Sequence, residues 1–409
     1  MDVNRRSFIK GLTAGAAGTA ISAGLVAAGA HADTAAGTTV AGVDGLDRVA
    51  FHGPHQAGVV TPAQRAATFA AFDITAVSGG QLRELFQALT ERARLLTAGG
   101  APVDLGTGSP PADSAVLGPV VPTDGLSITV SVGASLFDQR FGLAEKKPLR
   151  LAPMRTFAND ALDPAWCHGD LMVQICANNP DTVHHALRDI MKHTRAGIQL
   201  RYRLNGFISP PRPSGTPRNL MGFKDGTANP TPADAGGLVW VTPALGEPAW
   251  TTGGTYQVVR LIHMLVEFWD RVSLIEQEKM FGRKRDTGAP LDGVVELDKP
   301  NYDQDPQGRL IPLNSHIRLA NPRTPETDPG RILRRGYNYD RGVELNGNLD
   351  VGLIFCCYQR DISRQFEAIQ TRLAEDPLND YIQAFGGGYF FTLPGITTPD
   401  DWYARSLLS

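Results

Sequence analysis

Hydrophobic and polar residues follow one order of spacings through the first half of the chain. Two stretches, 81–96 and 181–194, place apolar residues every three to four positions, as amphipathic helices do. Four others alternate or run apolar as strands do: 67–75, 126–133, 170–177 and 197–207. The predicted order is therefore strand, helix, strand, strand, helix, strand.

The second half repeats that order. Helices are predicted at 266–281 and 362–374, and a long polar insert separates the first helix from the next strand. Strands are predicted at 255–265, 331–339, 351–359 and 388–393. Two copies of this pattern predict an α+β fold made of two tandem ferredoxin-like (βαββαβ) units with antiparallel sheets.

Changes in composition divide the chain into parts. A Pro-rich run at 209–217 separates an N-terminal unit, 48–210, from a C-terminal unit, 211–409. The first unit is preceded by small and polar residues, 33–47, which predict a disordered tether. A targeting segment, 1–32, comes before the tether.

The targeting segment has the features of a twin-arginine signal peptide. Arg5 and Arg6 precede an uncharged stretch rich in Ala and Gly, and Ala30-His31-Ala32 is a typical cleavage site. The alternative, a membrane-spanning helix, is less well supported because the stretch is only weakly apolar. The segment predicts export of a folded protein to the periplasm or outside the cell, with no membrane span after processing.

The segment 314–339 holds the first candidate chemistry. It reads NSHIRLANPRTPETDPGRILRRGYNY. In extended chains side chains alternate between faces, so His316 would share a face with Arg318, and Ile332 with Arg334. Arg335 would point away from Arg334, so only one arginine of the pair would face inward. A neutral imidazole binds metals and haem iron, and an inward guanidinium is a fixed cation, although both residue types also have purely structural roles.

A second segment, 219–230, reads NLMGFKDGTANP. Turn signals mark both ends, and Gly222 and Gly226 allow the backbone around Asp225 to approach a flat group closely. Alone, Asp225 reads equally well as a turn residue that caps its own backbone. Together with an isolated His and an inward Arg, it supplies the parts of a peroxidase haem site.

These motifs resemble those of the dye-decolourising peroxidases. GFKDG resembles their GxxDG motif, and SHIRLANPR and ILRRGYNY resemble their proximal-histidine and distal-arginine segments, with the exported, deferrochelatase-type subfamily as the best match. The resemblance covers nearly the whole chain after the signal. It implies one non-covalent haem b per chain in the C-terminal unit. The implied haem contacts are Gly226, Thr227, Ala228, Asn321, Pro322, Arg323 and Arg334.

Each candidate has a chemical role in such a site. His316 is the expected axial ligand to the iron. Asp225 is the expected proton shuttle, because a base must take a proton from hydrogen peroxide and return it to the leaving oxygen. Arg334 would stabilise the charge that develops. Arg323 suits a haem propionate as a bidentate partner.

Net charge and cysteine spacing limit which partners and which kind of haem attachment are expected. A net charge of −3 argues against a nucleic-acid partner. The four cysteines, at 167, 176, 356 and 357, form no CxxC or CxxCH motif, so covalent haem attachment is not expected and they are interpreted as core thiols. A disulfide between Cys167 and Cys176 is the alternative.

Three functions fit these features. The first is a peroxidase that uses hydrogen peroxide to oxidise organic donors such as dyes or phenols. The second is a deferrochelatase that releases iron from haem and leaves the porphyrin intact, working with iron-uptake proteins. The third is a non-enzymatic haem carrier, which would need His316 but not Asp225 and Arg334. A homodimer is also considered. Four aromatic residues are candidate electron relays or packing residues: Trp240, Trp250, Tyr337 and Tyr339.

Overall fold

The computed structural model describes residues 47–409. The twin-arginine segment and residues 33–46 of the expected tether therefore lie outside the described residues. Within residues 47–409, none of the helices combines the length and the apolar character that crossing a membrane requires.

The strands form a nine-stranded antiparallel sheet in the order β5-β9-β2-β3-β1-β4-β7-β8-β6, and β8 also pairs with β5. That additional pairing closes the sheet on itself. The strands are β1 (Ala66–Ile74), β2 (Ser127–Gly133), β3 (Leu171–Ala177), β4 (Ile198–Phe207), β5 (Thr255–Met264), β6 (Leu333–Arg334), β7 (Tyr337–Val343), β8 (Leu349–Gln359) and β9 (Ile382–Thr392).

Closure is a feature that the sequence pattern did not predict. The first-half strands lie in the order β4-β1-β3-β2 and the second-half strands in the order β9-β5-β8-β7. Three residue pairs join β2 to β9, from Ser131–Thr392 to Gly133–Phe390. At the other junction, Phe207 of β4 pairs with Asn338 of β7. The two halves therefore share one sheet.

Alternation along the strands separates two cores. Inward residues such as Phe69 and Cys356 pack inside the closed sheet, whereas Phe72 and Cys357 belong to a core on its outer face. Cys356 and Cys357 thus point to opposite faces, as alternation requires. All four cysteines are free and buried, so no Cys167–Cys176 disulfide forms. The four candidate relay aromatics are also buried within these cores.

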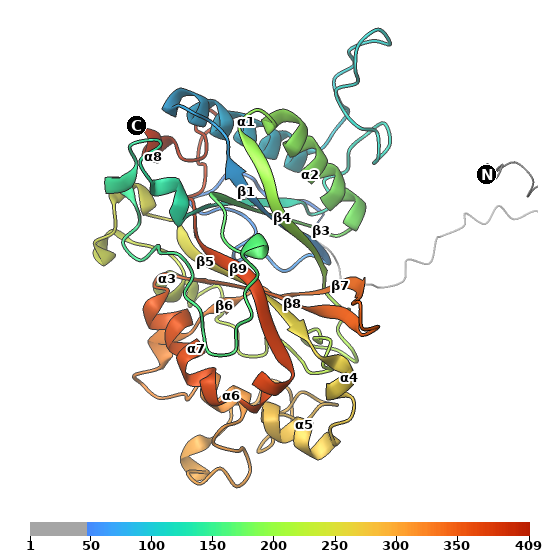
Figure 1. The fold of residues 1–409 in the computed structure, drawn as a ribbon, viewed down its shortest axis with the longest axis vertical. Helices are drawn as coiled ribbons and strands as arrows, with labels where there is room; N and C mark the ends of the chain where they lie inside the picture. The colour runs from blue at the N-terminus through green and yellow to red at the C-terminus, as the bar shows by residue number, and fades with distance from the viewer. Residues whose placement is uncertain (1–46) are drawn as a thin grey trace, which may run out of the picture. The chain divides into compact units, whose positions relative to one another are not determined.

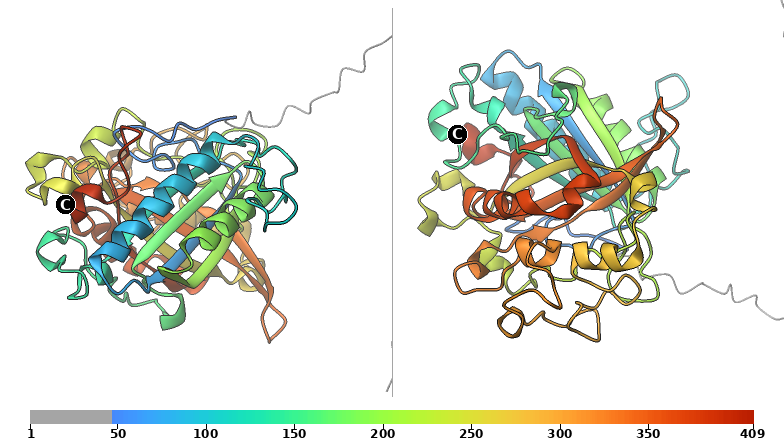
Figure 2. Two further views of the ribbon diagram at one scale, coloured as in Figure 1. Left: turned by 90° about the horizontal axis from the view of Figure 1, so that it is seen from above. Right: turned by 60° about the horizontal axis from the view of Figure 1, so that its bottom comes forward.

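Two long helices cover the outer face of the first half (Figures 1 and 2). Helix α1 (Gly79–Ala98) buries Leu82, Phe86 and Leu89, and α2 (Pro180–Thr194) packs beside it. The spacing of these apolar residues is the one that predicted the helices. The shorter helices are α3 (Ala235–Leu238), α4 (Val266–Trp269), α5 (Leu274–Phe281), α6 (His316–Ala320), α7 (Ala368–Arg372) and α8 (Arg405–Leu408).

Helices α4 to α7 lie at the other end of the molecule in Figure 1 and differ from the predictions. The single helix predicted at 266–281 is two helices, because Ser273 starts α5 with a capping box that it forms with Glu276. The helix predicted at 362–374 begins with a π-helical turn at Ser363–Glu367 before α7. The strand predicted at 331–339 is also interrupted, at residues 335–336 between β6 and β7.

Candidate functional site

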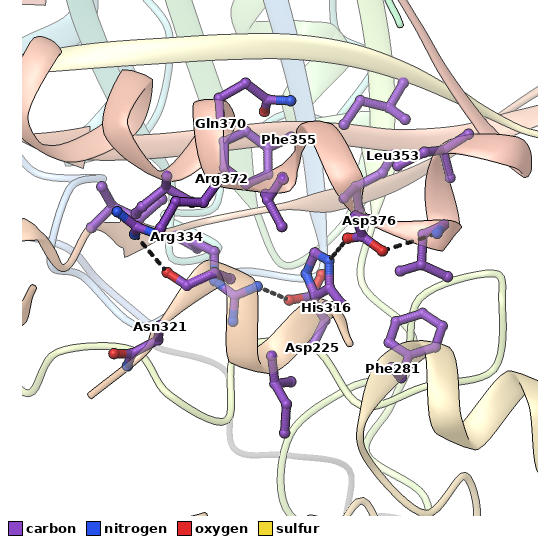
Figure 3. Close-up of a pocket in the computed structure, with 18 of the residues that line it drawn as sticks. Asp225, Phe281, His316, Asn321, Arg334, Leu353, Phe355, Gln370, Arg372 and Asp376 are labelled. Atoms are coloured by element: carbon purple, nitrogen blue, oxygen red, sulfur yellow. Dashed lines mark hydrogen bonds and ion pairs between the residues drawn. The ribbon is translucent and has the colours of Figure 1, made fainter. Parts of the chain in front are cut away.

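A large cavity lies among α5, α6, α7 and the lower parts of β5, β8 and β9 (Figure 3). Its wall comes from residues 219–384, with two additions from the first half, Asn159 and Asp160. The cavity is therefore in the predicted C-terminal half, but it is not built from that half alone. Apolar residues form much of the wall: Met221, Ile262, Met264, Phe281, Leu353, Phe355, Phe366, Ile369, Leu378 and Ile382.

His316 faces this cavity from the first turn of α6. The prediction of an extended segment here was wrong: residues 316–320 form a helix that starts after Ser315, which has extended backbone angles. Side chains at 316 and 318 therefore do not share a face. Arg318 instead donates to the carbonyl oxygens of Ile311 and Asp305, and Ile317 joins His316 in the cavity wall.

Asp376 orients the imidazole of His316. Its Oδ2 lies 2.6 Å from His316 Nδ1, and its side chain is only 3% exposed (Figure 3). Its other oxygen, Oδ1, accepts the backbone N–H of Leu378 at 2.9 Å. A carboxylate can only accept here, so Nδ1 carries the proton and Nε2 keeps its lone pair for a ligand. Sequence reasoning missed Asp376 because it lies far along the chain from the histidine motif.

Arg372 fixes the other end of α6. Its guanidinium donates to the carbonyl oxygens of Leu319 and Ala320, at 2.9 Å and 3.2 Å. The last carbonyls of a helix have no partner within the helix, so this arginine satisfies them. The helix that carries His316 is thus held at both ends by side chains from residues 372–376.

Asp225 and Arg334 meet in the same cavity. Arg334 Nη1 lies 2.9 Å from Asp225 Oδ1, and each side chain is about one quarter exposed (Figure 3). Ile332 also lines the cavity, so the predicted alternation around Arg334 is confirmed. Arg335 points away from Arg334, as the alternation predicted, so only Arg334 of the pair faces the cavity. Arg335 enters the interior of the closed sheet and donates to Thr61 O and Gln64 Oε1.

The loop that carries Asp225 is tied to β6. Asn229 Nδ2 donates to the carbonyl oxygen of Arg334 at 2.8 Å, and its Oδ1 accepts the Arg334 N–H at 3.1 Å. Gly226 has a φ of 102°, which favours glycine, and allows the chain to turn directly after Asp225. Asn229 therefore fixes the spacing between the carboxylate and the guanidinium. In the sequence, Asn229 is recognisable only as part of a turn.

The other expected haem contacts divide into three groups. Thr227, Ala228, Asn321 and Arg323 line the cavity. Gly226 lines a smaller adjoining pocket that shares Asp225 and Arg334 with the main cavity. Pro322 is part of neither wall.

The cavity has the chemical features that haem requires. Its walls are apolar, and His316 presents a ring nitrogen whose opposite nitrogen is held by a buried carboxylate. Arg323 lines the same cavity, and its Nε is buried without a hydrogen-bond partner among residues 47–409. An orphaned buried donor is costly unless a ligand satisfies it, which a propionate would do. The residues present therefore fit this cofactor.

Comparisons with known proteins identify the family of the chain. Family models described as Dyp-type peroxidase, N-terminal and C-terminal, match residues 56–208 and 216–397. A protein named deferrochelatase from Yersinia pestis is 52% identical over 365 residues, covering 88% of this chain and 84% of the relative. The deferrochelatase of Escherichia coli strain K12 is 51% identical over 366 residues, covering 88% of this chain and 86% of the relative.

Solved structures are similar over the same length. A DyP-type peroxidase from Cellulomonas bogoriensis superimposes with a TM-score of 0.80 at 36% identity, covering 88% of this chain and 98% of that one. Ferric DtpA from Streptomyces lividans gives a TM-score of 0.80 at 34% identity, covering 89% and 98%. The family models together match most of the chain, and the relatives are about half identical to it. The chain belongs to the Dyp-type peroxidase family.

Proposed function

We propose that this protein is a haem peroxidase that uses hydrogen peroxide to oxidise organic donors such as dyes or phenols. The observation that carries the proposal is the convergence of two pairs on one apolar cavity: His316 with Asp376, and Asp225 with Arg334. A haem carrier would need only the first pair. The second pair adds a base and a fixed cation, which are the groups that peroxide cleavage requires.

Haem b, bound non-covalently and once per chain, would supply the iron that accepts oxidising equivalents from peroxide. His316 Nε2 would hold the iron, with Thr227, Ala228, Asn321 and Arg323 as contacts along the wall. Asp225 would take a proton from one peroxide oxygen and return it to the other as the bond breaks. Arg334, 2.9 Å from Asp225, would stabilise negative charge on the departing oxygen and hold the carboxylate in position.

The test compares peroxide reactivity in the loaded protein and three variants. Asp225→Asn should retain the haem spectrum yet react with peroxide roughly 10²–10⁴-fold more slowly, the range typical of lost acid–base catalysis. Arg334→Leu should also be slowed, and His316→Ala should bind haem weakly or not at all. A fully active Asp225→Asn together with an inactive Arg334→Leu would make Arg334 the main catalytic group. An unchanged ferric spectrum in His316→Ala would refute the ligand assignment.

A second function, release of iron from haem, is favoured by the names of the relatives. The curated proteins that are about half identical to this chain are named deferrochelatases. Against this function, residues 47–409 contain no group of three or more His, Cys, Asp or Glu side chains placed to receive a metal ion. We therefore rank it below peroxidation. Stoichiometric metal-free porphyrin, formed from haem and a reductant without oxygen, would reverse that order.

The proposal also covers the location, the partners and the domain organisation of the protein. Export by the twin-arginine route, with cleavage after Ala32, would place the protein in the periplasm or outside the cell. Hydrogen peroxide, organic donors, iron-uptake proteins and a second copy of the chain are the proposed partners. The strand orders of the two halves support two ferredoxin-like units, 48–210 and 211–409, joined into the closed sheet.

A further inference from the structure

Most cations in the cavity wall have a carboxylate partner. Three ion pairs bind wall cations to carboxylates: Arg334–Asp225, Lys224–Glu296 at 3.0 Å and Arg331–Asp328 at 2.9 Å. Arg260 and Asp160 form another pair, and Arg372 donates to the end of α6. Among the described residues, the wall arginines left with no carboxylate partner and no role at a helix end are Arg283 and Arg323.

Arg283 is the more deeply buried of these two. It is 4% exposed and follows α5 at the start of the polar insert. Its Nη1 donates to the carbonyl oxygens of Gly288 and Glu296, at 2.6 Å and 2.9 Å. Its Nε is buried with no partner among residues 47–409. Burial, and then the positive charge of Arg323, lowers the pKa of Arg283 from its ordinary value. Keeping this guanidinium charged in the folded protein therefore costs free energy.

Two further orphaned donors lie beside Arg283. The Nε of Arg323 and the hydroxyl of Tyr302 are both buried without a hydrogen-bond partner in the described part of the chain. Burial raises the pKa of Tyr302, and the charge of Arg323, a direct side-chain interaction with Arg323 and the charge of Arg283 act against that rise, so the phenol lies near both guanidiniums. The Arg318 guanidinium stacks over the Tyr302 ring at 4.7 Å and holds it in place.

The three buried donors converge beside an apolar cavity, and together they require a ligand with negatively charged acceptor oxygens. Two guanidiniums repel each other, and a phenol O–H can donate only if an acceptor is present. A carboxylate would accept from all of these groups and neutralise the repulsion. Haem carries two propionates, so it can bring that carboxylate into the cavity on the same molecule that His316 binds.

We propose that Arg283, together with Arg323 and Tyr302, forms the binding site for one carboxylate of the bound haem. The inference rests on the proposed function and extends it to residues of the polar insert, which none of the sequence motifs included. The insert then has a definite role: it places a buried guanidinium at the rim of the cofactor cavity. A carboxylate on an organic donor has the same chemistry, and the experiment must separate the two sources.

The test titrates the haem-free protein with ferric haem and with its dimethyl ester, which lacks both propionate charges. The unmodified protein should bind the free acid more tightly than the ester. Arg283→Met should reduce that preference about 10- to 100-fold, which is the range for a lost hydrogen bond to a charged group. Arg285→Met is the matched control, because Arg285 lies two residues away and donates to Gln277 instead; it should leave the preference unchanged. Arg283→Lys keeps the charge and should retain part of the preference, which also serves if the Met variant folds poorly.

Several outcomes would overturn the inference. Equal binding of the free acid and the ester by the unmodified protein would refute the proposed carboxylate site but leave the haem peroxidase proposal intact. Equal weakening of both porphyrins in Arg283→Met would assign Arg283 a structural role only. An unchanged preference, accompanied by a raised KM for a carboxylated donor dye alone, would assign the site to the donor. Failure of the unmodified protein to bind either porphyrin would refute the proposed function as well.

Discussion

Asp376→Asn is the substitution that best tests how His316 is tuned. The carboxylate has two neighbours that donate to it: His316 Nδ1 at 2.6 Å and the Leu378 N–H at 2.9 Å. An asparagine has one acceptor oxygen, so in either amide orientation an N–H group faces another N–H group. The site is buried, so water cannot restore the lost bond.

The expected magnitude follows from that geometry. A hydrogen bond to a charged group contributes about 1.5–3 kcal/mol. Partners of metal-binding histidines change metal affinity by roughly 10- to 100-fold when mutated. A negative partner favours ferric over ferrous iron, so its loss should raise the midpoint potential of the haem. A tenfold loss of affinity that falls on ferric iron alone corresponds to about 59 mV for a one-electron couple. A 10- to 100-fold loss therefore gives a rise in midpoint potential of about 60–120 mV.

The assay is a spectroelectrochemical titration combined with a haem-binding titration. The matched control is Asp380→Asn, which removes the same charge from an exposed position in the same short helical turn, Pro377–Asp380. Asp376→Asn should shift both the potential and the affinity, and Asp380→Asn should shift neither by more than a small amount. Equal shifts in the two variants, or no shift in Asp376→Asn, would refute the reasoning.

Three further outcomes are expected. Asn229→Ala breaks two hydrogen bonds to the main chain of β6, so it should cost about 1–3 kcal/mol in the free energy of unfolding and slow the peroxide reaction, as urea unfolding and stopped-flow spectra would reveal. Burial alone would raise the pKa of Asp170, but hydrogen bonds from Arg140, the Ser135 side chain and the Ile74 backbone N–H hold that pKa below its usual value. The stabilisation is therefore present at neutral pH and lost as the pH falls through the lowered pKa. Asp170→Asn should therefore shrink the difference in stability between about pH 7 and about pH 3, and an unchanged difference would count against this. Replacing Arg5 and Arg6 with Lys should leave uncut precursor in the cytoplasm, a result that cell fractionation checks and normal export would contradict.

The sequence pattern was most informative where a single local rule decides the structure. Helices α1 and α2 lie within a few residues of their predicted bounds, because one apolar face at helical spacing is sufficient to define each. The alternation that placed Ile332 and Arg334 on one face also held. Local rules failed at 316–320, where five residues are too few to show a helical period.

What the pattern did not predict depends on contacts between distant residues. Asp376 reaches His316 only because β9 and the turn before it bring residues 373–380 against α6. The alternation placed Arg335 opposite Arg334 but could not identify its partners, which are Thr61 and Gln64 from the first half; both accept hydrogen bonds from its guanidinium. Closure of the sheet has the same origin, because pairing between β2 and β9 leaves no periodic signal in either strand.

The pairing of β2 with β9 also has a consequence for how the chain is made. During synthesis β2 (residues 127–133) leaves the ribosome about 250 residues before β9 (residues 382–392). Until then the edges of β2 and β5 are bare, and exposed strand edges readily pair with other chains. The sheet therefore cannot be completed until β9 has been made, and a chain truncated before residue 382 should aggregate instead of showing a milder local defect.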